Sequence, residues 1–231
     1  MAATPTLIQT PKLWSGSFGS SDSAWALLLT GTNLGGGGAN GSKITGLNCF
    51  TNDTVSRVMQ LFLVRALTVT VTVATPAVLS IAASAGNNLT VGDRMIFTTS
   101  GAMPTGITAG GANGWGAQIY YVISAGWTPG VSFEIAASAG GSTINTSGTQ
   151  SGVHTAWIAR LLGQVAIPAS AGNLGNASVD LLSSGTIPGL PVDGDGQQYI
   201  LLESGDYLAF QPTTTPTANK VFTMQAVGGN F

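Results

Sequence analysis

A single histidine is the one side chain of the sequence whose ordinary pKa suits general base catalysis near pH 7. His154 stands in a run rich in Ser, Gly and Thr, with hydroxyl groups close by at Thr149, Ser151 and Thr155. A hydroxyl nucleophile needs a base beside it, so a triad around His154 is conceivable. The Gly-x-Ser-x-Gly turn that presents a nucleophilic serine in many hydrolases is missing, however. We therefore assign no catalytic residue and interpret His154 as structural or solvent-facing.

Two carboxylates, Asp193 and Asp195, have the spacing found in some calcium-binding loops, in the run PVDGDGQQ. The remainder of the calcium-loop pattern is missing, and Asp-Gly pairs commonly form turns, so we predict a plain turn without a metal. The other acidic residues considered for a glycosidase-type pair are scattered along the chain: Asp53, Glu134, Asp180, Glu203 and Asp206. The sequence therefore predicts no catalytic pair, no metal and no cofactor.

Aromatic side chains are the remaining groups that could bind a ligand. Between residues 115 and 127 the chain carries Trp115, Tyr120, Tyr121 and Trp127, which could form a platform for sugar rings. Core or interface packing is the commoner use of such residues. A glycan contact through Trp115 and Trp127 stays open as an alternative.

The N-terminal stretch carries two large apolar side chains, Trp14 and Phe18, among Pro, Ser, Gly and Thr residues. Such a stretch predicts an extended arm or an edge strand. Both side chains need a buried environment, either in their own domain or on a neighbouring subunit. We name them as candidate interface residues.

The composition favours association over binding to charged partners. Only 7% of the 231 residues are charged, whereas about 25% is usual in soluble domains, and the formal net charge is -2. We therefore expect no binding to nucleic acid or to an anionic membrane. So few charges, with a mean hydropathy of +0.33, indicate a surface rich in Ser, Thr, Asn and Gln or a subunit largely covered by neighbours.

The lone cysteine, Cys49, excludes an intrachain disulfide and lies in an apolar run, where we expect it to be buried. The N-terminal sequence lacks the basic start and apolar core of a signal peptide. No window approaches the ~18 to 20 apolar residues that span a bilayer. Synthesis in a cytoplasm is therefore expected.

Short strands joined by tight turns are predicted for most of the chain. Between Asp93 and Ala156, runs of β-branched and aromatic residues alternate with Gly, Pro, Ser and Asn clusters. Residues 66–74, ALTVTVTVA, form the strongest strand pattern. The only helix is expected over residues 23–30, SAWALLLT, capped by Asp22 or Ser23.

Strand continuity indicates that a middle block is inserted into a host domain. The run SRVMQLFLVRA and the run WIARLLGQVAIPASAG have the same alternating character, and joining Ala66 to Trp157 yields two strands that could form a hairpin. The predicted host domain is therefore 1–66 plus 157–231, with 67–156 inserted. We expect an all-β protein: a host β-sandwich of jelly-roll type and a small antiparallel β-sandwich or barrel as the insertion.

Three passages resemble structural proteins of tailed bacteriophages. The first runs from GDRMIFTTSGAMPTGITAG through YYVISAG to FEIAASAGGSTINTSGTQSGVHTA and is similar to a Gly/Ser/Thr-rich β module that recurs in phage tail and capsid proteins. The second combines GSKITGL, QLFLVRA and LLGQVAIPASAGN, and the third runs from IPGLPVDGDGQQYILLESGDYLAFQP to TANKVFTMQAVGGNF. These two resemble a family of small virion proteins that lack the middle block.

The resemblance implies a virion structural protein without catalysis, made in the cytoplasm of a bacterial host. The expected role is a head-decoration or cement protein that forms a homotrimer and binds the major capsid protein. A tail component, such as a tube, collar or fibre subunit beside a neighbouring tail protein, is the alternative in the same class. A receptor- or glycan-binding module on the virion surface is the alternative from another class.

Overall fold

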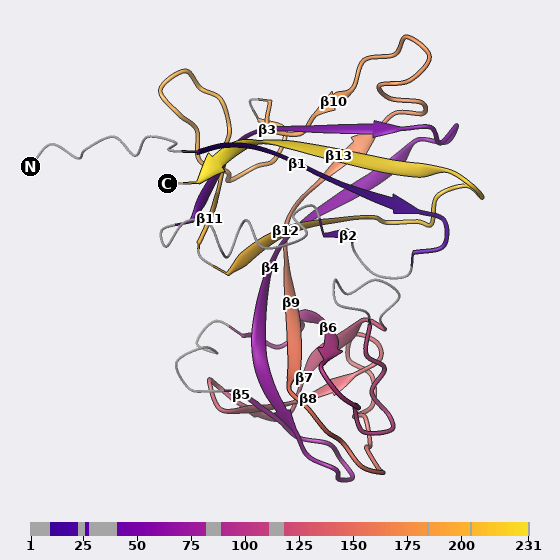
Figure 1. Ribbon diagram of the computed structural model, residues 1–231, viewed down its shortest axis with the longest axis vertical. Coiled ribbons are helices and arrows are strands. Elements are labelled where there is room, and N and C mark those ends of the chain that lie inside the picture. The colour runs from indigo at the N-terminus through magenta and orange to yellow at the C-terminus, as the bar shows by residue number, and fades with distance from the viewer. Residues whose placement is uncertain are drawn as a thin grey trace, which may run out of the picture. The chain divides into compact units, whose positions relative to one another are not determined.

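The computed structural model describes residues 10–22, 26–27, 41–81, 89–110, 118–183, 185–203 and 205–230 (Figure 1). All regular elements in these ranges are β-strands, so the predicted all-β class is confirmed. The jelly-roll connectivity of the host domain stays a prediction. In the part of the chain that the structure describes, there is no helix long and apolar enough to cross a membrane.

The chain forms two compact units. The second unit comprises Val64–Arg160, and the first unit comprises the described residues of Met1–Asp22, Ala26–Leu63 and Leu161–Phe231. Two long strands, β4 (Arg57–Val71) and β9 (His154–Ile167), carry the chain from one unit to the other. The domain boundaries predicted from the sequence, 66/67 and 156/157, fall inside these two strands.

The first unit contains an antiparallel sheet with the order β1-β13-β3-β10. Its strands are β1 (Thr10–Gly19), β3 (Ser42–Thr51), β10 (Val179–Asp180) and β13 (Val221–Asn230), and the short β11 (Ile200–Leu202) also pairs with β3. β1 lies at one edge of this order, and its register with β13 is continuous from Thr10 opposite Asn230 to Gly19 opposite Val221.

Alternation along these strands sends every second side chain into the interior of the first unit. Buried apolar residues of this sheet are Trp14 and Phe18 on β1, Ile44 and Leu47 on β3, and Phe222, Met224 and Ala226 on β13. Their neighbours along each strand lie on the outer side and include the apolar Leu13, Val221 and Val227 among polar and small residues. The buried residues share one face of each strand, because successive side chains of a strand point to opposite faces.

The predicted helix over residues 23–30 is wrong at Ala26–Leu27, which form strand β2. β2 pairs with β12 (Asp206–Pro212), with Ala209 opposite Leu27 and Phe210 opposite Ala26. The other residues of the predicted helix lie outside the described ranges. The run AWALLL has no polar face, so hydrogen bonds to β12 decide the local conformation rather than helix propensity.

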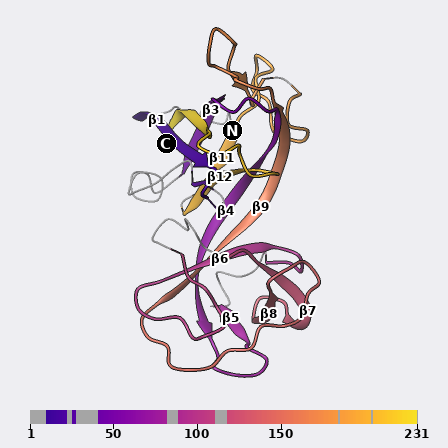
Figure 2. The same cartoon turned by 90° about the vertical axis from the view of Figure 1, so that its right-hand side faces the viewer.

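In the second unit the strands pair as β4-β5-β8-β7-β6-β9, and a further pairing of β4 with β9 closes this order into a ring among the described strands. The shorter strands are β5 (Leu79–Ile81), β6 (Arg94–Thr99), β7 (Tyr120–Thr128) and β8 (Ser132–Ala136). Figure 2 shows them from a second side. Their inward residues form one apolar cluster, including Val69, Leu79, Met95, Phe97, Tyr120, Val122, Phe133, Ile135 and Ile158.

Candidate functional site

His154 is buried in the second unit, with 5% of its surface exposed. Its Nδ1 lies 2.8 Å from the hydroxyl of Thr99 on β6, and its Nε2 lies 3.0 Å from Oε1 of Gln150. The amide nitrogen of Gln150 donates to the carbonyl of Val71 on β4 at 2.6 Å. These contacts connect β4, β6 and β9 around one imidazole ring.

The hydrogen-bond chain determines which ring nitrogen carries the proton. Because the Gln150 amide nitrogen faces the Val71 carbonyl, its Oε1 faces the ring as an acceptor, so Nε2 of His154 must donate. Nδ1 then accepts from the Thr99 hydroxyl, whose oxygen accepts in turn from the backbone N–H of Gly101 at 3.2 Å. Burial lowers the pKa of His154 below its usual value of 6.5.

This arrangement ties strands together and lacks the polarising partner of a catalytic base. The ring is oriented by a neutral amide, which stabilises an imidazolium far less than a carboxylate does. Of the hydroxyls singled out in the sequence, Ser151 accepts a hydrogen bond from Ala102 N at 3.2 Å, and Thr149 is exposed. Thr99, the hydroxyl that contacts the ring, lies 55 residues away and only the pairing of β6 with β9 brings it there.

Asp193 organises the turn that the PVDGDGQQ run predicts. Its Oδ1 accepts from the backbone N–H of Asp195 at 3.1 Å and of Gln197 at 2.9 Å, and Val192 pairs with Gln198 across the turn. Asp195 is exposed. Within the described residues, no three His, Cys, Asp or Glu side chains gather as a metal site would require.

The scattered carboxylates occupy separate local structures. Asp180 accepts from Leu182 N at 2.9 Å, and Asp206 accepts from Glu203 N at 3.2 Å, so each stabilises a turn. Glu134 lies on β8 in the second unit and is 7% exposed. Gly126 makes room for it, since a Cβ there would approach Glu134 Oε1 to 2.4 Å.

The aromatic residues considered as a sugar platform have different environments. Tyr120 is 2% exposed in the core, where its hydroxyl accepts from Thr108 N at 2.8 Å. Trp127 packs half-buried against the same core, and Tyr121 lies half-buried beneath the guanidinium of Arg94, 5.9 Å from its ring centre. Trp115 lies outside the described residues. The described members of the set serve the second unit's own packing.

Small, uncharged residues line a groove of about 300 Å³ in the second unit. Val91, Gly92, Ser124, Ala125, Ser142 and Thr143 are among them. None of its lining residues is charged or aromatic. The groove therefore has neither the charged groups that a catalytic site uses nor the rings that a sugar-stacking site uses.

Trp14 and Phe18 are 8% and 2% exposed, so the first unit itself covers both side chains. Both side chains therefore belong to the core of the first unit and have little exposed surface, and their assignment as interface residues stays a prediction. The two-residue period of β1 turns Leu13, Ser15 and Ser17 outward in their place. Cys49 is fully buried, as predicted, and burial raises the pKa of its thiol to about 12.

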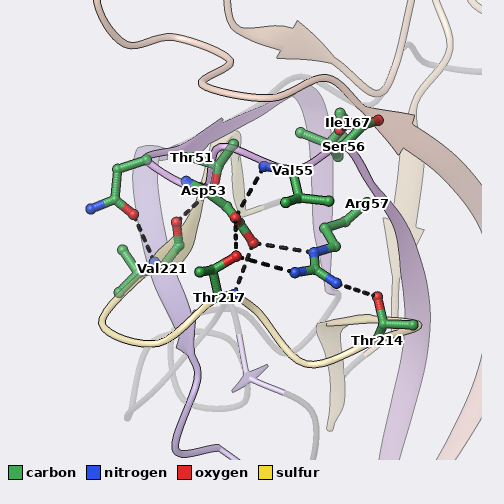
Figure 3. Close-up of polar contacts among 10 residues, drawn as sticks. Thr51, Asp53, Val55, Ser56, Arg57, Ile167, Thr214, Thr217 and Val221 are labelled. Carbon is green, nitrogen blue, oxygen red and sulfur yellow. Dashed lines mark hydrogen bonds and ion pairs between the residues drawn. The ribbon is translucent and has the colours of Figure 1, made fainter.

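A buried aspartate, Asp53, is the centre of the densest polar cluster of the first unit (Figure 3). Its carboxylate accepts from Val55 N at 3.1 Å, from Thr217 N at 3.1 Å and from the Thr217 hydroxyl at 2.6 Å. Arg57 Nε completes the set at 3.1 Å as an ion pair. The remaining guanidinium nitrogens of Arg57 donate to the hydroxyls of Thr214 and Thr217.

The Asp53 cluster is a structural tie between two loops. Burial alone raises the pKa of the carboxyl, but the hydrogen bonds from Thr217, Val55 and Arg57 outweigh it and hold the pKa at about 2. Asp53 therefore stays ionised and joins the turn after β3 to the loop before β13. The sequence does not reveal the contact with Thr217, because Thr217 lies 164 residues away from Asp53.

The outer side of β1 and β13 forms an uncharged surface of the first unit. We call it the β1–β13 surface, and its residues are Pro11, Leu13, Ser15, Ser17, Val221, Thr223, Gln225 and Val227. Leu13 is 68% exposed, and Val227, directly opposite in the register, is 48% exposed. Large apolar side chains held on a flat sheet are characteristic of contact surfaces.

Comparisons of the chain with protein-family models, with curated proteins and with solved structures found no match in any of the three.

Proposed function

We propose that the protein is a non-enzymatic structural subunit of a tailed-phage virion that acts through protein contacts. The observation that carries the proposal is the β1–β13 surface, where Leu13 and Val227 are exposed side by side and no charged residue interrupts the face. Only 7% of the residues are charged, so the chain has few charges to keep it soluble while this apolar face is exposed. A neighbouring subunit that covers the face would remove it from water. The resemblance of three passages to phage proteins supports the virion setting.

Within the virion we propose a head-decoration or cement role. A decoration protein needs one face for its neighbours and a stable fold, and it needs no reaction chemistry. The described polar clusters fit that requirement, because His154 and Asp53 use their hydrogen-bonding capacity within the fold. A tail subunit has the same needs and is separated from the head role by position in the particle.

Labelling of intact phage particles tests the proposal. A tag follows the C-terminus, and gold-conjugated antibody is bound to purified particles for electron microscopy. Label spread over the head in many copies is the expected result. Label at the tail or at one vertex would replace the head role by a tail role, and unlabelled particles containing no detectable protein would overturn the virion proposal.

A further inference from the structure

β1 has an open edge in the first unit. Of the described strands only β13 pairs with it, and that ladder continues over all ten residues from Thr10 to Gly19. A strand with one partner directs about half of its backbone N–H and C=O groups away from that partner, here toward a side on which no described strand pairs with β1. This edge is therefore able to pair with a further strand.

The residues of β1 that protect its edge from pairing lie at the start of the strand. Natural edges are protected by proline, lysine, bulges or short length. Pro11 and Lys12 supply two of these devices, whereas Leu13–Gly19, LWSGSFG, contains no charge, no proline and no shift in its register with β13. This part of the edge carries no such protection as far as Phe18, and it ends at Gly19, whose N–H donates to Asp22 Oδ2 at 2.6 Å and whose carbonyl accepts from Asp22 N at 3.2 Å.

We propose that a second copy of this chain pairs with Trp14–Phe18, antiparallel and around a two-fold axis at Gly16. Residues directly opposite each other must point to the same face, which the axis at Gly16 satisfies. It places Trp14 opposite Phe18 and Ser15 opposite Ser17 of the second copy, and the pairing stops before Gly19, whose backbone groups bond Asp22. Pro11 and Lys12 stay outside the paired segment.

The segment is complementary to itself in size and charge. The outward serines meet each other, and a glycine at the axis leaves room for close approach of the two backbones. No like charges face one another, because the segment has none. A two-fold contact also closes on itself, so pairing consumes both open edges and exposes no new one.

The dimensions indicate a weak contact between free copies. Trp14–Phe18 spans roughly 17 Å at about 3.4 Å per residue, and a sheet about 10 Å thick then buries on the order of 350 Å² over both copies. A specific contact between free proteins needs about 1,000 Å². Copies held close together on a lattice pair much more readily, because their effective concentration is high. The inference therefore rests on the proposed role as a subunit in an assembly.

A register-specific disulfide tests the pairing. Full-length Ser15→Cys and Ser17→Cys proteins are incubated separately and as an equal mixture, at high concentration, with oxidised glutathione. Opposite Cα atoms in an antiparallel ladder lie about 4.5–5.5 Å apart, which a disulfide can bridge, whereas diagonal positions lie about 7–8 Å apart. The mixture should form at least tenfold more covalent dimer than either variant alone.

Two controls isolate the edge from other contacts. The wild-type chain should form no covalent dimer, because Cys49 is buried. A mixture of Ser17→Cys with Gln225→Cys places the second thiol at an exposed position of β13 away from the edge, and should also form no covalent dimer. Equal dimer yield in the Ser15→Cys sample alone, or no excess in the mixture, would overturn the proposed register.

Charge variants give a second measurement that needs no thiol. Ser15→Lys with Ser17→Asp puts opposite charges across the axis and should increase dimer content in sedimentation velocity. Ser15→Asp with Ser17→Asp puts like charges there and should decrease it. Identical sedimentation of the two variants would refute the pairing. The gold-label experiment on particles does not depend on either of these tests. Failure of the edge contact can therefore be told apart from failure of the proposed virion role. A two-fold contact also differs from the expected homotrimer, and the mass of the complex separates the two.

Discussion

Replacement of Asp53 by asparagine is the sharpest test of the first unit's polar core. Asparagine keeps the shape of the side chain but replaces one acceptor oxygen by an NH2 group. Each carboxylate oxygen of Asp53 accepts two hydrogen bonds, so either orientation of the amide directs a donor at two donors. Arg57, whose side chain is only 16% exposed, also loses its counter-charge.

The expected loss of stability can be estimated from the contacts of Asp53. The pKa of Asp53 falls from 3.8 to about 2, and at about 1.4 kcal/mol per pKa unit its interactions favour the ionised form by roughly 2 kcal/mol. Breaking a buried ion pair costs about 3 to 5 kcal/mol in general. Arg57 keeps the Thr214 and Thr217 hydroxyls as partners, so we expect Asp53→Asn to lower the free energy of unfolding by about 2 to 4 kcal/mol.

Urea denaturation followed by tryptophan fluorescence measures this loss, with Asp195→Asn as the exposed control expected within about 0.5 kcal/mol of wild type. The pH dependence gives a second reading. Because the folded pKa of Asp53 is depressed, its contribution is complete above pH 3.8 and is lost as the pH falls toward 2. The difference between wild type and Asp53→Asn should shrink over that interval. A loss below about 0.5 kcal/mol at pH 7, or a difference independent of pH, would refute the reasoning.

Three further predictions concern separate parts of the fold. Burial lowers the pKa of His154 in the folded chain, so the unfolded chain binds a proton more readily. The melting temperature of the wild type should therefore fall as the pH drops below about 6.5. In His154→Gln it should fall less. Gly228→Ala should lower the free energy of unfolding, measured in urea, by at least about 2 kcal/mol, because its Cβ would lie 2.1 Å from the carbonyl oxygen of Lys43. Gly194→Ala is the control and should be near neutral, because its Cβ would meet nothing within 4 Å. Cys49 should react with a thiol reagent only on unfolding, and rapid reaction of the native protein would contradict its burial.

The glycan-binding alternative has its own expected outcome. Trp127 packs half-buried against the core of the second unit, so Trp127→Ala should lower stability by about 3 kcal/mol or less and leave any adhesion to cells unchanged. Adhesion assays with matched folded protein check this. Loss of adhesion without loss of stability would restore the sugar-binding role of this residue.

Strand periodicity predicted the all-β class because its signal is local. Residues 66–74 alternate between Thr and apolar side chains, and Thr68 and Thr70 are exposed where Leu67, Val69 and Val71 are buried. The helix predicted over residues 23–30 is wrong at Ala26–Leu27, because a short apolar run has no period of its own and pairing with the distant β12 determines the conformation of these two residues. Trp14 and Phe18 were chosen for their size, whereas the parity of β1 determined which residues face outward.

The polar clusters could not be predicted because their members are far apart in the chain. Asp53 and Arg57 are four residues apart and could have been noticed as a pair, but Thr217 meets them only through the approach of β13 to β3. Thr99 reaches His154 through the ladder between β6 and β9. Sequence spacing identifies turns such as Asp193–Gln197 well, since all their hydrogen bonds are local.

Incorporation of a surface variant into particles tests the central claim most directly. Leu13→Asp with Val227→Asp places charge on the β1–β13 surface, and Leu174→Asp, on an 87% exposed side chain of the same unit, is the matched control. Copies per particle are counted by quantitative mass spectrometry against the major capsid protein. We predict many copies of the wild type and of the Leu174→Asp control, and at least a tenfold loss for the surface variant at unchanged stability. Equal incorporation of all three would contradict assembly through this surface, and absence of the wild type from particles would contradict the virion role itself.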